Sequence, residues 1–133
     1  MKKINIIISA GLFLLVSVFF GCNQKSEQQT DSHMVSKEIS ITEAKAKLTE
    51  GKYIFIDLRT PEEIEESGKV KGAIEMNFRD SDFNSKFAAL DKDKPYVVYC
   101  AGGGRSGKTL KLAKELGFTE VYDMTEGFSQ WGE

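Results

Sequence analysis

The spacing of apolar positions changes at residue 100. Residues 96–100 form a β-branched and aromatic run that ends at Cys100, the pattern of a buried strand. A glycine-rich segment follows, after which Leu110, Ala113 and Leu116 recur with helical spacing. The pattern predicts a strand, a tight loop and a helix in succession.

Other strands are predicted on both sides of this unit. Residues 53–57 are mostly apolar and show no alternation of polar and apolar positions. This is expected of a strand in a parallel sheet that is covered on both faces. Residues 73–76 and 120–124 give two shorter strands. Because strands and helices alternate, we expect a small α/β domain with a mainly parallel central sheet flanked by helices on both faces.

Two capping boxes mark helix starts. Ser40 with Glu43, and Thr60 with Glu63, place a hydroxyl residue three positions before a glutamate, which satisfies free N–H groups at a helix start. The first helix is expected to continue through residue 48, with Gly51 just beyond its end.

Aromatic residues predict the remaining helices. Phe83, Phe87 and Leu90 follow one another at i, i+4 and i+7, the spacing of one face of a helix, which we expect to be capped near Ser81. Residues 128–131 are expected to form a terminal helix that packs its aromatic side chains on the sheet. These phenylalanines are interpreted as core.

Residues 1–21 have the features of an export signal. Lys2 and Lys3 precede an apolar run from residue 4 to residue 20, which ends at Gly21 and Cys22. This ending resembles the lipobox of bacterial lipoproteins, in which the cysteine is diacylated and becomes the mature N-terminus. A single membrane-spanning anchor is the alternative. The lipoprotein interpretation is favoured, with a lipid-anchored domain in the cell envelope, outside the cytoplasm.

Residues 22–36 are polar, without apolar periodicity, and are expected to form a flexible tether. Residues 37–133 are enough for one domain with one core. The only histidine, His33, lies in the tether. Because a catalytic partner needs a fixed position, Cys100 is expected to have no histidine base.

Charge and cysteine content limit the classes of function that the chain can have. The formal net charge is −2 and basic residues are interleaved with acidic ones, which disfavours nucleic acid as a partner. If Cys22 carries lipid, Cys100 is unpaired in an exported protein, which indicates a reactive thiol. The alternative is a disulfide between them. The sequence indicates no metal site.

The glycine-rich loop supplies chemistry for that thiol. Such a loop turns its N–H groups inward, and the next helix adds unpaired donors and partial positive charge. An anion site beside Cys100 favours the thiolate, the nucleophilic form, so we predict a catalytic nucleophile. The expected anion-binding residues are Ala101, Gly102, Gly103, Gly104 and Ser106.

Two nucleotide-binding motifs also match this loop. Residues 102–109 fit G-x-x-x-x-G-K-T, and the glycines at 102, 104 and 107 fit G-x-G-x-x-G. Both motifs normally open a domain with several strands still to follow. Only about two dozen residues follow Thr109, so both interpretations are disfavoured.

The pattern Cys-x4-Arg-Ser after a buried strand resembles the rhodanese family of sulfurtransferases. The resemblance covers about residues 38–131. Residues 56–63 resemble the family's D-x-R-x-x-x-E segment, residues 72–74 the end of its G-H-x-x-G-A-x stretch, and residues 117–122 and 127–131 its closing strand and aromatic helix. Lys69 departs from the family, which usually has histidine there.

The resemblance implies a reaction and roles for individual residues. In this family, a loop of six residues counted from the cysteine to the arginine accompanies sulfur transfer, and Cys100 to Arg105 has this length. In related phosphatases and arsenate reductases the loop is one residue longer. The implied enzyme is of the thiosulfate sulfurtransferase type: Cys100 takes sulfur from thiosulfate or a small persulfide and passes it to a thiol or cyanide. Arg105 is expected either to brace the loop carbonyls, which the resemblance favours, or to point outward and receive the anionic donor. No cofactor is needed.

Alternatives to this enzyme remain open. A non-catalytic sulfur carrier or partner-binding module of an envelope redox system would hold sulfur on Cys100 for a partner protein. A small phosphatase or arsenate reductase is the other alternative. Asp57 and Arg59 lie where a central strand ends, and an ion pair that supports the loop is favoured over direct catalysis.

Overall fold

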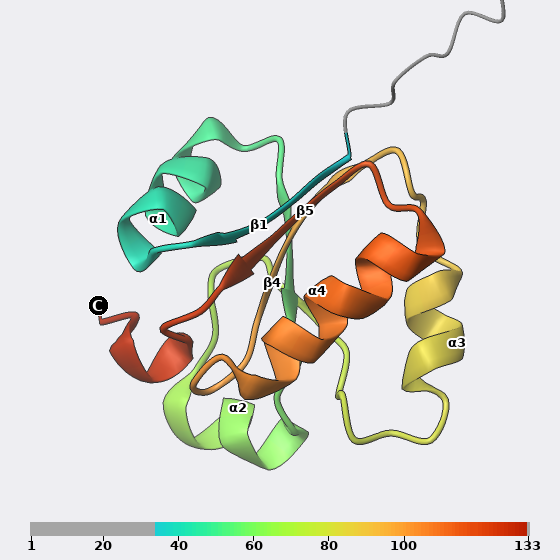
Figure 1. Cartoon of the computed structure of the whole chain (residues 1–133). Helices are drawn as coiled ribbons and strands as arrows, with labels where there is room; N and C mark the ends of the chain where they lie inside the picture. Colours follow the sequence, from blue (N-terminus) through green and yellow to red (C-terminus); the bar gives the residue numbers. More distant parts are fainter. Residues whose placement is uncertain (1–33, 133) are drawn as a thin grey trace, which may run out of the picture. The chain divides into compact units, whose positions relative to one another are not determined.

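The structure, a computed structural model, describes residues 34–132 (Figure 1). Strands and helices alternate along this part of the chain, as the sequence predicts. The elements are β1 (Val35–Ile39), α1 (Ile41–Glu50), β2 (Ile54–Asp57), α2 (Pro61–Ser67), β3 (Ile74–Glu75), α3 (Phe83–Ala88), β4 (Pro95–Tyr99), α4 (Gly104–Leu116), β5 (Glu120–Met124) and a 3₁₀ helix, η1 (Phe128–Gln130).

The five strands form one sheet in the order β1-β5-β4-β2-β3, and every neighbouring pair is parallel. β4 lies at its centre, with Val98 opposite Ile56 of β2 and Asp123 of β5. The carboxyl ends of parallel strands meet at one edge, where sites of α/β proteins form. Cys100 and Asp57 therefore lie at the same edge.

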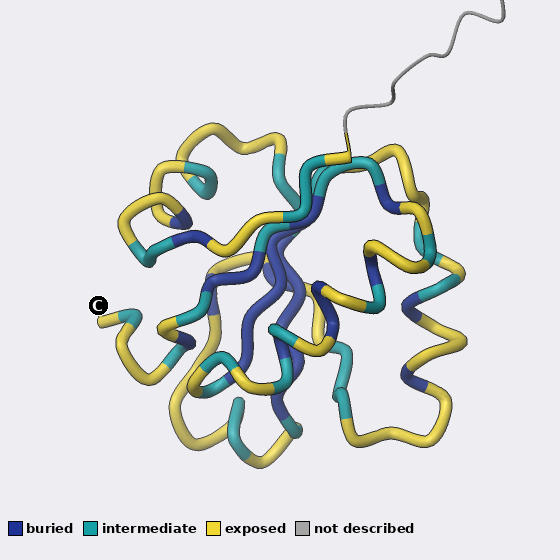
Figure 2. The backbone as a smooth tube through the Cα atoms, viewed as in Figure 1, coloured by how far each residue is buried: buried dark blue, intermediate teal, exposed yellow. Residues whose placement is uncertain are grey.

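Helices cover both faces of the sheet, which confirms the predicted α/β architecture. One core cluster contains Phe83 and Phe87 of α3 with Leu110 and Ala113 of α4, packed on one face of the central strands. The other contains Ala44 of α1 and, partly buried, the aromatic residues near the C-terminus. Figure 1 shows α1 on one side and α3 and α4 on the other. Figure 2 shows burial concentrated in the central strands.

Both predicted capping boxes are present. The Ser40 side chain accepts a hydrogen bond from the Glu43 N–H, and the Glu43 carboxylate accepts one from the Ser40 N–H; Thr60 and Glu63 repeat the arrangement. Gly51 ends α1 with φ of 72°, a left-handed conformation that favours glycine. These local signals predicted the helix starts because their hydrogen bonds join residues three positions apart.

The first strand begins earlier than the predicted domain boundary. Residues 35 and 36, assigned from the sequence to the tether, belong to β1, and Val35 donates to the Thr119 carbonyl over 2.8 Å. An edge strand paired with β5 across the domain has no local signal. The predicted export signal, Cys22 and His33 lie outside the described residues.

The third helix is shorter than predicted. It ends at Ala88, so Leu90 lies beyond it. Its N-cap is Asp82, next to Ser81 as predicted, but the Asp82 side chain makes no capping hydrogen bond. Leu90 still packs against the core, because its N–H bonds the Phe87 carbonyl in a final turn. Similarly, β3 spans two residues within the four predicted. No helix within residues 34–132 is long and apolar enough to cross a membrane.

Candidate active site

The loop after β4 wraps around the sulfur of Cys100. The side chain is almost fully buried, at 2 % exposure. The Gly103 N–H donates to Sγ over 3.2 Å, and the Ser106 hydroxyl oxygen lies 3.7 Å from Sγ. Because α4 begins at Gly104, the free N–H groups of its first turn also face the sulfur. The structure thus brings the predicted anion-binding loop and Cys100 together.

These donors favour the thiolate. Burial of Cys100 opposes ionisation and by itself raises the pKa of the thiol. Ser106 counters it with hydrogen bonds from its backbone N–H and its hydroxyl, and the N–H groups of Gly102 and Arg105 add to them. The pKa of Cys100 consequently lies below its ordinary value. The thiolate, which is the nucleophilic form, is therefore more easily formed here than on an ordinary cysteine.

Gly103 is required at its position. Its φ is 90°, and a Cβ there would lie 2.2 Å from the Thr125 carbonyl oxygen. No larger side chain fits without moving backbone, so glycine allows the loop to turn tightly enough to aim its N–H at Sγ.

Residues 127–131, here called the C-terminal strap, hold the loop from its carbonyl side. Phe128 N–H donates to the Cys100 carbonyl over 2.7 Å, and Ser129 N–H donates to the Ala101 carbonyl over 3.1 Å. Gly127 makes this approach possible, because a Cβ there would lie 2.2 Å from the Ala101 oxygen. With its carbonyls bound on one side, the loop keeps its N–H groups on the other.

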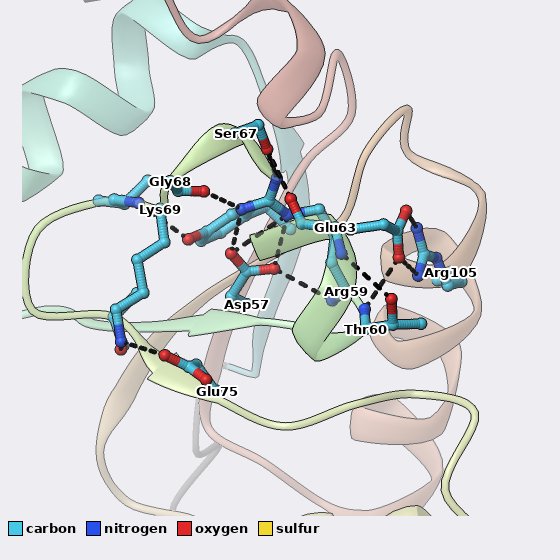
Figure 3. Close-up of polar contacts among 12 residues, drawn as sticks. Asp57, Arg59, Thr60, Glu63, Ser67, Gly68, Lys69, Glu75 and Arg105 are labelled. Carbon is cyan, nitrogen blue, oxygen red and sulfur yellow. Dashed lines mark hydrogen bonds and ion pairs between the residues drawn. The ribbon is translucent and has the colours of Figure 1, made fainter. Parts of the chain in front are cut away.

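Arg105 does not brace the loop carbonyls as expected. Its guanidinium forms a two-pronged ion pair with Glu63 of α2: Nη1 to Oε2 at 2.7 Å and Nη2 to Oε1 at 2.6 Å (Figure 3). This pair raises the pKa of Arg105 above its ordinary value, partly offset by burial and reinforced by the nearby Cys100 sulfur. A planar guanidinium fits a carboxylate better than single carbonyl oxygens, which explains the difference.

Glu63 therefore interacts with two helices, α2, which it caps, and α4, through Arg105. It accepts the Thr60 N–H in the capping box, over 2.8 Å, while it binds Arg105. The Arg105 bond, acting against burial and together with the Thr60 N–H, lowers the pKa of Glu63 to about 2. The sequence marked Glu63 only as a cap, because Arg105 lies 42 residues further along the chain.

Asp57 and Arg59 form the expected ion pair, with Nη2 and Oδ2 at 2.6 Å and both side chains buried. Arg59 also donates to the Ser67 hydroxyl and the Gly68 carbonyl at the end of α2. Its guanidinium carbon lies 4.0 Å from the ring centroid of Phe128. The pair thereby ties β2, α2 and the C-terminal strap together beside the loop (Figure 3).

Lys69, which departs from the family pattern, stabilises the segment that connects α2 and β3. Its Nζ donates to the Ala73 carbonyl over 3.1 Å and forms an ion pair with Glu75 at 2.6 Å. Lys69 lies away from Arg105, which follows the loop (Figure 3). The substitution therefore changes local packing rather than the chemistry at the sulfur.

A pocket of about 260 Å³ opens beside the loop. Its lining combines the ends of α2, the loop and the C-terminal strap. The lining residues are Arg59, Glu63, Glu66, Ser67, Ala101, Phe128 and Ser129. The sequence did not identify the contributions of Glu66 and Phe128, because only the fold brings them next to Ala101. No cluster of three metal-ligating side chains occurs among residues 34–132.

Comparison with known proteins identifies the family. The model of the rhodanese-like domain matches residues 40–133. The chain belongs to the rhodanese-like family. The matched region holds α1 through the C-terminal strap and so contains every element that builds the Cys100 site.

Individual relatives agree with this rhodanese-like assignment. The putative sulfurtransferase YtwF of Bacillus subtilis is 36% identical over 99 residues, 74% of this chain and 92% of that protein. A tRNA sulfurtransferase of Haemophilus influenzae is 39% identical over 88 residues, 64% of this chain but 18% of that protein. The crystal structure of a rhodanese-like domain protein from Staphylococcus aureus has a TM-score of 0.64 at 28% identity, covering 73% and 92% of the two chains.

Proposed function

We propose that this protein is a sulfurtransferase that carries a sulfane sulfur as a persulfide on Cys100. The observation that carries the proposal is the buried sulfur of Cys100 surrounded by N–H donors, with its pKa lowered although burial opposes ionisation. The same donors can stabilise a persulfide anion, which extends the negative charge by one sulfur atom. Family membership supports sulfur as the transferred group.

The proposed reaction has two displacement steps. The Cys100 thiolate attacks the outer sulfur of a donor R–S–S⁻, the S–S bond of the donor breaks, and R–S⁻ leaves with its electron pair. An acceptor thiolate or cyanide then attacks the outer sulfur of the Cys100 persulfide and regenerates the thiolate. Both steps conserve charge and need no external oxidant, so the reaction is ping-pong.

Charge in the pocket favours a small persulfide over thiosulfate as donor. The guanidinium groups of Arg59 and Arg105 are already paired with Asp57 and Glu63. Among the described residues, no ion pair involves Glu66, which also lines the pocket. The uncompensated charge there is therefore negative, which repels a dianion and attracts the ammonium group of a donor such as cysteine persulfide.

Mass spectrometry of the full-length protein, followed by peptide mapping, tests the reaction class. After treatment with cysteine persulfide we expect a gain of one sulfur atom on the Cys100 peptide and its loss on addition of cyanide. Cys100→Ser should gain none. A wild-type protein that gains no sulfur from either cysteine persulfide or thiosulfate would refute the proposal.

Turnover separates the enzyme from the alternatives. An enzyme forms thiocyanate from cyanide repeatedly, whereas a sulfur carrier loads once and releases sulfur only to a partner protein. A phosphatase would hydrolyse an aryl phosphate, which the six-residue loop from Cys100 to Arg105 disfavours. Thiocyanate formation without phosphatase activity is the expected result.

We also propose that the domain is lipid-anchored through Cys22 in the cell envelope. The support is the sequence of residues 1–22. The test is membrane fractionation with metabolic labelling by a fatty acid. Wild-type protein should be labelled and sediment with membranes, and Cys22→Ser should lose the label; equal labelling of both would contradict the proposal.

A further inference from the structure

The sulfur of Cys100 is enclosed by its own loop. The residue is 2 % exposed, and the pocket beside the loop is lined by Ala101 but not by Cys100. An S–S bond is about 2 Å long, so a donor has to reach Sγ itself. The arrangement described above stabilises the thiolate but leaves Sγ almost no surface for contact with a donor.

Gly102 is the least supported residue of this loop. Its neighbours are held on both sides: the Cys100 and Ala101 carbonyls accept hydrogen bonds from the C-terminal strap, and the Gly103 carbonyl accepts one from the Gly107 N–H over 2.9 Å. Within residues 34–132, no backbone–backbone hydrogen bond involves Gly102, and this residue is exposed. The loop is therefore anchored at its two ends and unsupported in its middle.

The shape of the loop does not require glycine at positions 102 and 104. A Cβ at either position would meet no atom within 4 Å, and neither residue has a positive φ. Gly103, between them, differs on both counts, with φ of 90° and a Cβ position 2.2 Å from the Thr125 carbonyl oxygen. Alanine would fit at 102 and 104 and would restrict the backbone more than glycine does. Glycine at these two positions therefore adds freedom of movement that the closed loop does not use.

We propose that the Cys100 loop opens about Gly102 and Gly104 and that sulfur exchange takes place in the open state. Opening rotates the peptide group between Gly102 and Gly103, so that the Gly103 N–H leaves Sγ and the sulfur becomes accessible. Closing returns this donor to the thiolate or, after transfer, to the persulfide. This inference rests on the proposed function only in taking Cys100 as the thiol that reacts.

The contacts of the rotating peptide group make this movement inexpensive. In the part of the chain that the structure describes, this group makes one hydrogen bond, from the Gly103 N–H to Sγ at 3.2 Å. Because the segment is exposed, water can replace that bond in the open state. Glycine adopts φ of either sign, so residues 102 and 103 can both follow the rotation. The bonds from the C-terminal strap to the Cys100 and Ala101 carbonyls stay in place.

The first experiment measures how fast iodoacetamide alkylates Cys100 in full-length protein in detergent, read on the Cys100 peptide by mass spectrometry. The rate is taken at high pH, where the thiol is fully ionised, so that a change in its pKa does not affect the comparison. Gly102→Ala and Gly104→Ala should each slow alkylation about two- to fivefold, because alanine fits the closed loop and restricts the open one. Unchanged rates in both variants would overturn the proposal.

Gly107→Ala is the matched control. Gly107 also lacks a positive φ, lies within α4, and its Cβ would make an ordinary contact of 3.5 Å with Asp123 Oδ2. Alanine should stabilise α4 and leave the alkylation rate unchanged, because residue 107 lies beyond the anchored end of the loop. Equal slowing in all three variants would show that alkylation requires unfolding of the whole domain, and the proposal would be wrong.

A bulkier reagent separates loop opening from simple obstruction. If the new methyl groups blocked the approach to Sγ, an iodoacetamide that carries a naphthyl group would be slowed more than iodoacetamide itself. If alanine acts on opening, both reagents should be slowed by the same factor in Gly102→Ala. A loss that grows with the size of the reagent would reject opening in favour of obstruction.

Hydrogen exchange reports on the movement without any reagent at the sulfur. The Gly103 amide is bonded to Sγ, so it exchanges with solvent when the peptide group rotates. After correction for intrinsic exchange rates, the amide should exchange about two- to fivefold more slowly in Gly102→Ala than in wild type. Gly107→Ala should leave the exchange of Gly103 unchanged. Equal exchange in Gly102→Ala and wild type would contradict the proposal.

Loading with cysteine persulfide separates this inference from the proposed function. Loading that slows in parallel with alkylation supports opening as the step before transfer. A protein that never loads, but whose alkylation and exchange respond as expected, would reject the proposed function and leave the opening. Normal loading with unchanged alkylation in every variant would reject the opening and leave the proposed function.

Discussion

At the residue scale, the site is built from charges that compensate each other almost completely. Arg59 and Arg105 are bound to Asp57 and Glu63, so neither guanidinium is free to receive an anionic donor. Neutralised cations hold geometry, so in the proposed reaction the recognition of a donor depends on the residual charge in the pocket. That charge comes from Glu66.

Glu66→Gln is expected to shift donor preference toward thiosulfate. Removing the negative charge lowers the repulsion of a dianion and weakens the attraction of an ammonium group, each by about 0.5–1 kcal/mol for a charge in water. The measurement is kcat/KM for thiosulfate and for cysteine persulfide, with a ratio changed about fivefold or more. Glu65→Gln, on the same helix but outside the pocket, is the control; an equal shift there would show a general charge effect.

Asp123→Asn is expected to stabilise the protein at pH 8 but not at pH 4. The pKa of Asp123 is raised from 3.8 to about 6, so the folded state binds the proton more tightly than the unfolded state. The contribution of Asp123 to the free energy of unfolding is therefore greatest below about pH 4 and falls as pH rises through about 6, by up to about 3 kcal/mol. Urea unfolding at both pH values measures the difference between wild type and variant. A variant less stable than wild type at pH 8 would contradict this account.

At the element scale, the loop is shaped by contacts with α2 and the C-terminal strap rather than by its own sequence alone. Gly102, Gly103 and Gly104 give the loop freedom to turn. The bonds from Phe128 and Ser129 to its carbonyls select one conformation from many. Glu63 fixes the start of α4 through Arg105.

Gly127→Ala is expected to abolish persulfide formation, with Gly51→Ala as its matched control. Both glycines have φ near +70°, so both substitutions carry a similar backbone strain of about 1 kcal/mol. Only at Gly127 does the new Cβ collide with the Ala101 backbone, whereas it meets nothing at Gly51. Persulfide loading measures the effect on the site, and urea unfolding measures the effect on stability. Similar losses of activity in both variants would refute the role of the strap.

Glu63→Gln and Glu63→Ala separate the two roles of this residue. Glutamine can replace glutamate in a capping box, so Glu63→Gln should keep α2 and free only the Arg105 charge, raising kcat/KM for thiosulfate. Glu63→Ala should also lose the cap, at about 1 kcal/mol of unfolding free energy.

The pH dependence provides a further check on Glu63. Because its pKa is lowered to about 2, the stability that the pair provides is present above the ordinary value of 4.5 and is lost as pH falls toward 2. Glu63→Gln should reduce this acid dependence. Identical acid unfolding of wild type and Glu63→Gln would contradict the pairing.

At the scale of the whole molecule, one parallel sheet brings distant segments to a single edge. Asp57 lies at the end of β2, Cys100 directly follows β4, and the chain after β5 forms the C-terminal strap beside them. β1 protects the outer side of β5 and buries Ile39, which is 3 % exposed. The functional domain therefore includes β1, which the predicted boundary at residue 37 divides.

A chain that begins at residue 34 is expected to be more stable than one that begins at residue 40. The shorter chain leaves the β1 side of β5 unpaired, while the pairing with β4 remains. It also loses the burial of Ile39, about 2 kcal/mol from the side chain alone. Urea unfolding of the two fragments measures the difference. Equal midpoints would show that β1 contributes nothing to the fold.

Local signals in the sequence were sufficient for the helix starts and the central strands, and they also pointed to Cys100 as the proposed nucleophile. Capping boxes join residues three positions apart, and the apolar run before Cys100 can only be buried. The fold class and the Asp57–Arg59 pair followed from the same short-range patterns, and both are confirmed. The shortness of α3 and β3 was not predictable, since element ends depend on packing.

The tertiary structure alone decided the partners of the site. Glu63 and Arg105 are 42 residues apart, and their pairing, like the contact of Phe128 with the loop, exists only once the sheet has formed. No local pattern marks Asp123 as the buried neighbour of Gly107. The sequence by itself determined which atoms could react and which segments would be strands or helices. The protonation state and the accessibility of these atoms depend on burial and on contacts between distant parts of the chain, which only the folded structure creates.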